Sequence, residues 1–285
     1  MVQLGGQTPL NLAENLEKSG AHIIGTQLDG LDEAGDRDRF SQLVRRLGLR
    51  QPANRIAKSN DKILSMALEV GFPVLIRPSF VLGGRGMFIV YDENGIEDFV
   101  KNSGVEASIK APVLIDQFLD DAFEYDLDAV SDGTSLYIGG ILQHIEAAGI
   151  HSGDSAAVFP PYKSNPEILS QMKQWAHKLA VALCVKGLMN IQFAAKDDQL
   201  YLIEVNPRAS RTVPFISKAS GVNLIEAAVR IWEGQDLVSQ KLVKTKGSLG
   251  EGHCITGWAI KEAVFSFDRF TNVDPLLGPE MRFYR

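Results

Sequence analysis

The stretch Leu202-Ile203-Glu204-Val205-Asn206-Pro207-Arg208 (LIEVNPR) decides the fold that we predict for this chain, because it combines an apolar strand with polar residues suited to binding. An apolar run at 188–195 precedes it, and the polar segment Lys196-Asp197-Asp198-Gln199 separates the two. Two such runs joined by a short polar segment are typical of a β-hairpin. We therefore predict two antiparallel strands here.

Strand alternation divides the side chains of this hairpin between two faces. The predicted apolar face comprises Ile191, Phe193, Tyr201, Ile203 and Val205. The opposite, polar face comprises Gln192, Glu204 and Asn206. If residues 197–199 form a three-residue loop, Lys196 pairs with Leu200 and Gln192 lies directly opposite Glu204. A two-residue loop would shift the register by one and break this pairing.

The polar face offers oxygen ligands for a cation. Glutamine, glutamate and asparagine at 192, 204 and 206 suit hard cations such as Mg²⁺ or Mn²⁺ and give no reason to expect zinc. Pro207 ends the strand, and Arg208 and Arg211 then lie close enough to bind a phosphate through forked hydrogen bonds. The alternative interpretation is the solvated polar face of an antiparallel strand.

Length and charge limit the other possibilities. The chain has 285 residues and a formal net charge of -6, so we expect no general attraction to nucleic acid or to anionic lipid. Cys184 and Cys254 form neither a metal-ligand spacing nor a disulfide framework. No apolar run approaches the roughly 20 residues that a membrane span needs. We predict a protein of the reducing cytoplasm with no membrane or nucleic-acid partner.

Both ends of the chain are predicted to be cut. Thr8 and Pro9 can start a helix that stops at Gly20 before a strand-like segment at 21–26, which is the second half of a βαβ unit. The strand expected before Gly5-Gly6-Gln7 is missing, and the segment 274–282 is rich in turn residues. We expect a fragment of a longer protein.

The middle of the chain has an α/β pattern. Helical spacing is found at 36–47, 61–70, 167–183 and 223–232. Strands are predicted at 73–77, 87–91, 113–117, 124–130 and 135–145, and a loop or boundary at 241–252.

A glycine-rich segment, Arg77-Pro78-Ser79-Phe80-Val81-Leu82-Gly83-Gly84-Arg85-Gly86-Met87, lies between two predicted strands. No helix follows its glycines and no Gly-Lys-Ser/Thr ends it, so it is neither a dinucleotide-binding fingerprint nor a P-loop. Small residues still let backbone N–H groups approach a triphosphate. The alternative is a plain flexible turn.

A second candidate binding loop is Ile145-Glu146-Ala147-Ala148-Gly149-Ile150-His151-Ser152-Gly153-Asp154-Ser155. Glycines, serines, a histidine and an acid in so short a run favour binding. We interpret His151 as a hydrogen-bonding group at a phosphate or a ribose, with an ordinary polar turn as the alternative.

Together these segments resemble the large subunit of carbamoyl-phosphate synthetase, in the ATP-grasp superfamily. The resemblance covers almost the whole chain and rests on GGQTPL (5–10), QPAN (51–54), RPSFVLGGRGM (77–87), HIEAAGIHSGDSA (144–156), GLMNIQFA (187–194), LIEVNPRASRTVPFISKASG (202–221) and DPLLGPEMR (274–282). It implies an α/β (α+β) ATP-grasp fold whose two lobes, with antiparallel or mixed sheets, clamp ATP. It also implies a partial Rossmann-like segment at 1–35, an ATP-grasp domain at 36–235 with its lid hairpin at about 73–130, and an extension at 236–285.

The arginine of GGRGM, the HSGDS string and RTVPF resemble the carboxyl-terminal half of that subunit. This implies ATP-dependent phosphorylation of carbamate to carbamoyl phosphate, in a synthesis from bicarbonate, glutamine or ammonia, and ATP for pyrimidine and arginine biosynthesis. It further implies ATP with Mg²⁺ or Mn²⁺, and as partners the remainder of the large subunit and a glutaminase small subunit.

The resemblance also implies roles for individual positions. Arg37 and Arg77 would contact nucleotide phosphates, and Gly83 and Gly84 would belong to the loop that closes over them. Gln117, Leu119 and Glu124 match the adenine and ribose segment, although many members carry histidine at the position of Gln117. Gly149, Ile150, His151 and Ser152 match another nucleotide-binding loop. Gln192, Glu204 and Asn206 match the metal ligands, and Arg208 and Arg211 match the catalytic cations.

Two other functions stay open. The same nucleotide site could activate a different carboxylate in another ATP-grasp ligase. The chain could also be a nucleotide-binding module without catalytic activity.

Overall fold

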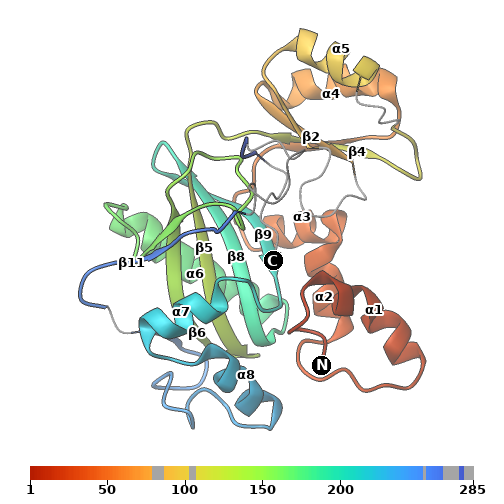
Figure 1. The fold of residues 1–285 in the computed structure, drawn as a ribbon. Helices are drawn as coiled ribbons and strands as arrows, with labels where there is room; N and C mark the ends of the chain where they lie inside the picture. Colours follow the sequence, from red (N-terminus) through yellow and green to blue (C-terminus); the bar gives the residue numbers. More distant parts are fainter. Residues whose placement is uncertain (79–86, 103–106, 253–254, 266–275, 279–285) are drawn as a thin grey trace. The chain divides into compact units, whose positions relative to one another are not determined.

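The computed structural model describes the chain except for residues 79–86, 103–106, 253–254, 266–275 and 279–285. The chain divides into two compact units. Unit 1 comprises Met1–Gln51, Glu124–Gln143 and Ala157–Lys261, and unit 2 comprises Pro52–Phe123, His144–Ala156 and Glu262–Arg285. Each unit is described by itself (Figure 1).

Unit 1 is built on a seven-stranded sheet with the strand order β11-β7-β6-β5-β8-β9, and β10 pairs with β6. Its strands are β5 (Phe123–Asp132), β6 (Leu136–His144), β7 (Ala157–Phe159), β8 (Lys186–Lys196), β9 (Gln199–Asn206), β10 (Leu249–Glu251) and β11 (Ala259–Lys261). The predicted strands at 124–130 and 135–145 and the hairpin of β8 and β9 are confirmed.

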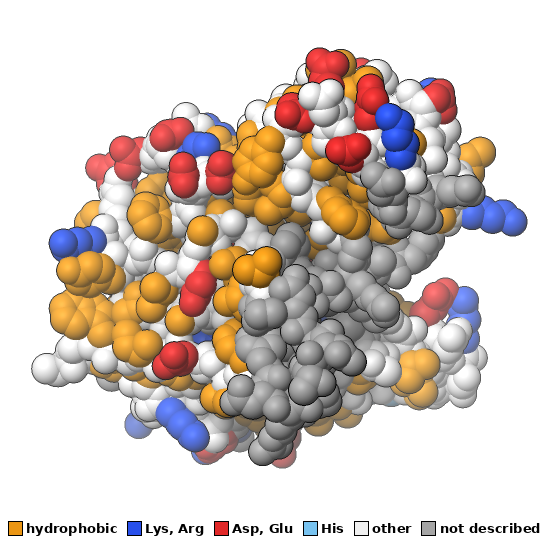
Figure 2. Space-filling model, turned by 45° about the horizontal axis from the view of Figure 1, so that its top comes forward, with side chains coloured by type: hydrophobic (Ala, Val, Ile, Leu, Met, Phe, Trp, Pro, Cys, Tyr) orange, Lys and Arg blue, Asp and Glu red, His pale blue; other side chains and the backbone are white. Residues whose placement is uncertain are grey.

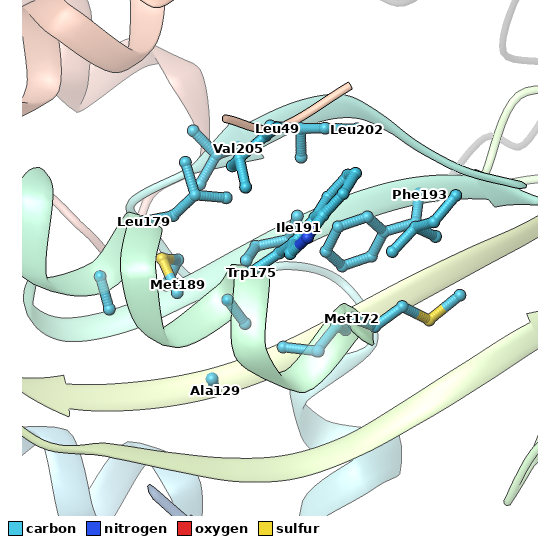
Figure 3. Close-up of a cluster of buried hydrophobic side chains, with 14 of the residues drawn as sticks. Leu49, Ala129, Met172, Trp175, Leu179, Met189, Ile191, Phe193, Leu202 and Val205 are labelled. Atoms are coloured by element: carbon cyan, nitrogen blue, oxygen red, sulfur yellow. The ribbon is translucent and has the colours of Figure 1, made fainter. Parts of the chain in front are cut away.

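Helices cover both faces of this sheet. Helix α6 (Pro166–Ala182) packs on one face, where Trp175 lies 6.4 Å from Phe193 between ring centroids (Figure 3). Helices α7 (Val213–Ser220) and α8 (Leu224–Trp232) pack through Ile216 and Leu224 on a second apolar cluster, which contains Val130 of β5. Since successive residues of β5 point to opposite faces, Ala129 belongs to the first cluster and Val130 to the second.

The hairpin turn differs from the predicted one. Lys196 pairs with Gln199, so the loop has two residues, and Asp197 and Asp198 both have positive φ, at 51° and 55°. Two positive φ angles are the signature of a type I′ turn, whose twist matches that of the strands. The predicted three-residue loop and its Lys196–Leu200 pair are therefore wrong.

Gln192 nevertheless lies opposite Glu204, because a β-bulge restores the predicted pair. Phe193 pairs with Leu202 and Gln192 with Glu204, which leaves Ile203 as an extra residue on β9. Leu200 and Leu202 are buried, whereas Tyr201 is half-buried and Ile203 is exposed. The predicted apolar face is correct for Ile191, Phe193 and Val205, and wrong for Tyr201 and Ile203.

The amino-terminal segment of unit 1 contains α1 (Gln7–Lys18), α2 (Leu28–Gly35) and α3 (Arg37–Arg46). Helix α1 starts one residue before Thr8, with Gly6 as its N-cap. The strand expected at 21–26 is not formed. Thr26 instead bonds through its Oγ1 with Gln3 Nε2 at 2.9 Å and Lys186 N at 3.0 Å. Side-chain bonds to other parts of unit 1 thus replace strand pairing here.

Unit 2 contains a four-stranded antiparallel sheet with the order β1-β4-β2-β3. Its elements are β1 (Asn54–Ala57), η1 (Asn60–Lys62), α4 (Ile63–Val70), β2 (Val74–Pro78), β3 (Phe88–Val90), α5 (Glu93–Asn102) and β4 (Val113–Gln117). Ile63 and Ala67 of α4 and Ile96 and Phe99 of α5 pack with Ile76 of β2 in its core. The predicted strands at 73–77, 87–91 and 113–117 and the helix at 61–70 are confirmed.

On the surface shown in Figure 2, Lys and Arg lie scattered among acidic and apolar side chains. Of the helices in the described part of the chain, none is long and apolar enough to span a bilayer.

Candidate functional site

A strip of polar side chains crosses β5, β8 and β9 of unit 1, on the sheet face opposite α6. Its members are Asp126, Asp128, Asn190, Gln192, Glu204 and Asn206. The intervening residues Leu127, Ile191 and Val205 are buried on the α6 side. The alternation of three neighbouring strands therefore gathers these polar groups.

The three predicted metal ligands lie together in this strip. Gln192 pairs directly with Glu204, and Asn206 Nδ2 donates to Glu204 Oε1 at 2.8 Å. Gln192 Nε2 donates to Asp126 Oδ1 at 3.3 Å. Both amide groups use their nitrogen in these bonds, so their oxygens are oriented away from these partners. Two amide oxygens and a carboxylate fit the donor set of a hard divalent cation.

The rest of the strip consists of Asp126, Asp128 and Asn190, which the sequence interpretation did not single out. Asp126 is 4% exposed and Asp128 is fully buried. Asn190 Nδ2 donates to Asp126 Oδ1 at 3.3 Å and to Asp128 Oδ1 at 3.0 Å. The signal was available: two acids alternate along the predicted strand 124–130, on the face that Glu124 also occupies.

Asp128 bonds to the segment that follows β9. Its Oδ1 accepts from Ser210 Oγ at 2.6 Å, and its Oδ2 accepts from Thr212 Oγ1. Burial and the neighbouring charge of Asp126 raise the pKa of Asp128 to about 6, against the three hydrogen bonds that lower it. Hydrogen bonds thus hold the Asp128 side chain in place, whereas burial and the charge of Asp126 disfavour its ionised form.

Arg208 lies half-buried at the end of β9. Its Nη1 donates to Ala209 O at 3.0 Å, and its buried Nε has no hydrogen-bond partner among the described residues. Burial lowers the pKa of Arg208, and the charges of Glu204 and Asp128 oppose this. An arginine stays charged under such a shift, so the guanidinium remains a cation near Glu204. Arg211, three residues later, is exposed.

The other two implied residues of unit 1 lie on different elements. Arg37 is the first residue of α3, and Asp36 caps this helix by accepting from Arg39 N at 2.9 Å. Glu124 lies near the start of β5, two residues before Asp126 on the same face.

In unit 2, Arg77 near the end of β2 donates through Nε to Asp116 Oδ2 at 2.9 Å. Burial raises the pKa of Asp116, and Arg77 opposes this rise by its charge and its hydrogen bond. The guanidinium is therefore oriented by an ion pair that uses its Nε. Gly83 and Gly84 lie outside the described residues.

The two remaining nucleotide-binding segments of the resemblance lie side by side in unit 2. Gln117 N donates to Ala53 O at 2.7 Å, and Leu119 is 7% exposed. A Cβ on Gly149, whose φ is 90°, would come within 2.8 Å of the Phe118 ring. Gly149 therefore lets the loop of Ile150, His151 and Ser152 approach the segment of Gln117 and Leu119.

His151 forms hydrogen bonds to neighbouring residues of this loop. Its Nδ1 accepts from Gly153 N at 3.0 Å, and its carbonyl accepts from Asp154 N at 2.8 Å. The His151 N–H donates to Gly278 O at 2.8 Å. The bonds of His151 to Gly153 and Asp154 fold this segment into a compact turn.

Solved structures with this fold include the biotin carboxylase from Campylobacter jejuni in its β-γ-ATP complex, with a TM-score of 0.71 and 19% identity over 88% of this chain and 55% of that chain. The biotin carboxylase domain of the Hydrogenobacter thermophilus 2-oxoglutarate carboxylase, in complex with MgADP, ADP and bicarbonate, has a TM-score of 0.70 and 20% identity over the same shares. At these identities the likeness shows the fold alone. It confirms the predicted ATP-grasp fold.

Curated relatives are much more similar in sequence. The carbamoyl phosphate synthase large chain of Vibrio cholerae is 51% identical over 99% of this chain and 26% of its own length, and that of Archaeoglobus fulgidus is 50% identical over 99% and 26%. The "large chain, C-terminal section" of Aquifex aeolicus is 47% identical over 99% of this chain and 54% of its own. This chain thus spans about a quarter of the first two relatives.

The family model described as "Carbamoyl-phosphate synthase L chain, ATP binding domain" matches residues 36–240, which is well over half of the chain. Together with the polar strip and its arginines, this match shows that the chain belongs to the ATP-binding domain family of the carbamoyl-phosphate synthase large chain.

Proposed function

We propose that this chain binds ATP with Mg²⁺ or Mn²⁺ and phosphorylates carbamate to carbamoyl phosphate. The observation that carries the proposal is the group formed by Gln192, Glu204 and Asn206, next to the half-buried cation Arg208. Oxygen ligands beside a guanidinium are what phosphoryl transfer requires, because its catalysis consists mainly of alignment and charge neutralisation.

The names of the relatives support the choice of substrate. Large chains of carbamoyl phosphate synthase match over almost all of this chain, and one match is to a carboxyl-terminal section. We therefore assign the sequence to the carboxyl-terminal half, as its RTVPF and HSGDS strings indicate. The remainder of a large chain and a glutaminase small subunit are proposed partners, in the synthesis of carbamoyl phosphate for pyrimidines and arginine in the cytoplasm.

In the proposed reaction, a carbamate oxygen attacks the γ-phosphorus of ATP, the bond from this phosphorus to its bridging oxygen breaks, and ADP leaves. Gln192, Glu204 and Asn206 would hold the divalent cation, which neutralises charge on the phosphate oxygens. Arg208 and Arg211 would bind the transferred phosphoryl group and the carbamate. Glu124, Gln117 and Leu119 are proposed to bind ribose and adenine, and Arg37, Arg77, Gly83, Gly84 and the Gly149–Ser152 loop the phosphates.

The test combines binding with the reverse reaction in the intact protein. Calorimetry with the Mg²⁺ complex of a non-hydrolysable ATP analogue measures nucleotide binding. An assay with carbamoyl phosphate and MgADP then measures ATP formation. We expect both binding and ATP formation.

Each other result identifies an alternative. Binding without ATP formation, together with ADP release stimulated by another carboxylate, would indicate a different ATP-grasp ligase. Binding with no turnover on any acid would indicate a nucleotide-binding module. Failure to bind the nucleotide would contradict the proposal altogether.

A further inference from the structure

The segment Pro207–Thr212, which carries both candidate catalytic arginines, is fixed in unit 1 at two points. At its start, Gln3 Nε2 donates to Pro207 O at 2.8 Å, and Ala209 N donates to Gln3 O at 2.9 Å. At its end, the hydroxyls of Ser210 and Thr212 both donate to the Asp128 carboxylate. The segment is therefore attached at positions 207, 209, 210 and 212, and Arg208 and Arg211 each lie between two of these attached residues.

The second of these attachments is unusual in its chemistry. Asp128 is fully buried. The two hydroxyls do not need a carboxylate as a partner, because Ser210 Oγ and Thr212 Oγ1 lie 2.7 Å apart and one could donate to the other. Burying a carboxylate costs much more than burying a neutral group. Buried charges therefore call for an explanation beyond simple packing, since an apolar residue could fill the same space at lower cost.

We propose that Asp128 is a positioning residue, which sets the geometry of Arg208 and Arg211 through its hydrogen bonds to Ser210 and Thr212. Each oxygen of its carboxylate accepts from one hydroxyl, and Asn190 orients it from the neighbouring strand. A carboxylate that accepts at both oxygens fixes both hydroxyls relative to β5. The two arginines would then bind the phosphoryl group from a rigid segment, so this segment would not have to become ordered during the reaction.

This inference rests on the proposed function, because it gives the segment a role in phosphoryl transfer. Three variants of the intact protein test it in the reverse reaction. Asp128→Ala removes the acceptor, Ser210→Ala with Thr212→Val removes both donors, and Asp128→Asn keeps the bonding capacity, because an amide can accept from Ser210 and donate to Thr212. Rates are expressed per MgADP-binding site, as counted by calorimetry.

We expect the first two variants to lose ~10–100-fold in kcat with an unchanged KM for MgADP. Asp128→Asn should stay within about twofold of the parent. When Asp128→Ala is added to Arg208→Gln or to Arg211→Gln, it should cost less in at least one of the two backgrounds than it does alone, because its effect passes through these arginines. The matched control is Asp132→Asn on the same strand, whose carboxylate accepts from the backbone N–H groups of Thr134, Ser135 and Leu237. It should leave kcat unchanged.

A parental kcat in Asp128→Ala would overturn the proposal, as would an Asp128→Asn variant as slow as Asp128→Ala. So would additive effects of Asp128→Ala with both the Arg208 change and the Arg211 change, since additivity with both indicates a merely structural role.

Hydrogen exchange tests the attachment without any activity. In Asp128→Ala the Thr212 amide, which donates to Ser210 Oγ at 3.1 Å, should exchange at least ~10-fold faster, whereas the Ala209 amide, bonded to Gln3 O, should not change. If the parent protein forms no ATP but shows this exchange pattern, the proposed function fails and the attachment stands. Unchanged exchange at Thr212 would overturn the attachment itself.

Discussion

Glu204 lies directly opposite Gln192 although the hairpin turn that joins their strands is one residue shorter than this pairing requires of regular strands. The unpaired Ile203 makes up the difference. The bulge therefore serves two requirements. It lets the core take Leu200 and Leu202, and it still places Glu204 on the polar face beside Gln192.

Glu204→Gln should abolish ATP turnover while the protein stays folded. The side chain is exposed and its replacement has the same shape, so the unfolding temperature should hardly change. Loss of the only carboxylate among the three candidate ligands should lower kcat at least ~100-fold. Steady-state kinetics and thermal unfolding check this, with Glu233→Gln at the exposed end of α8 as the control. Near-parental activity in Glu204→Gln would refute the metal-ligand assignment.

Asp128→Asn should stabilise the protein above pH 6 and leave its stability unchanged near pH 4. Asp128 has a pKa of about 6 in the fold against an ordinary value of 3.8, so the folded state binds the extra proton between these values. The free energy of unfolding of the parent must then fall as pH rises through this range, and the variant escapes the fall. The difference should reach at most ~3 kcal/mol at pH 8. Urea unfolding at pH 4, 6 and 8 measures it, and a variant less stable than the parent at pH 8 would contradict the expectation.

Two glycines of α2 should respond in opposite ways to alanine. A Cβ on Gly30 would come within 2.2 Å of the Leu183 carbonyl oxygen, and a backbone atom cannot move aside cheaply. Gly30→Ala should therefore lower the free energy of unfolding by ~1–3 kcal/mol. Nothing lies within 4 Å of a Cβ on Gly35, so Gly35→Ala should be neutral or stabilising by up to ~1 kcal/mol. Equal effects in denaturant unfolding would show that helix propensity, not the contact with Leu183, decides both.

Arg77→Met should weaken both nucleotide binding and the fold of unit 2, and a second substitution should separate the two effects. Asp116 would lose its ion-pair partner while largely buried, at a cost of ~2 kcal/mol. Adding Asp116→Asn should restore the stability. It should not restore the affinity for the Mg²⁺–ATP analogue, which we expect to fall at least ~10-fold with the loss of a phosphate-binding cation. Calorimetry and thermal unfolding of the single and double variants decide this, and affinity that returns with stability would argue against a phosphate contact.

Most strands of the two sheets follow from the sequence, but the strand expected at 21–26 is not formed. The prediction of the hairpin is wrong where alternation is interrupted. Strict alternation from Val205 back to Tyr201 assigned the wrong residues to the core, because a bulge leaves no mark in a run such as Leu200 to Val205 in which most residues are apolar. The turn length could not be read either, since Asp197-Asp198 is compatible with both two and three residues.

The partners of the site were harder to predict than its ligands. Gln192 and Glu204 belong to one hairpin, so local periodicity relates them. Asp128 contacts Ser210 and Thr212 across more than 80 residues of sequence, and only the order of strands in the sheet brings them together. Helix α2 was missed for a similar reason. Its two glycines argue against a helix locally, and the need for one of them appears only in its contact with Leu183.

The unpaired Ile203 also means that the turn length alone does not set the position of Glu204, although it fixes the register of a regular hairpin. In the same sequence without a bulge, the two-residue turn would place Ile203, and not Glu204, opposite Gln192. The position of Glu204 thus depends on the bulge as well as on the turn. What the extra residue adds is a local bend next to Glu204. A change of one residue in chain length at this point would redirect the carboxylate while the sheet keeps its order, so the direction of Glu204 can evolve, or be engineered, independently of the fold that supports it.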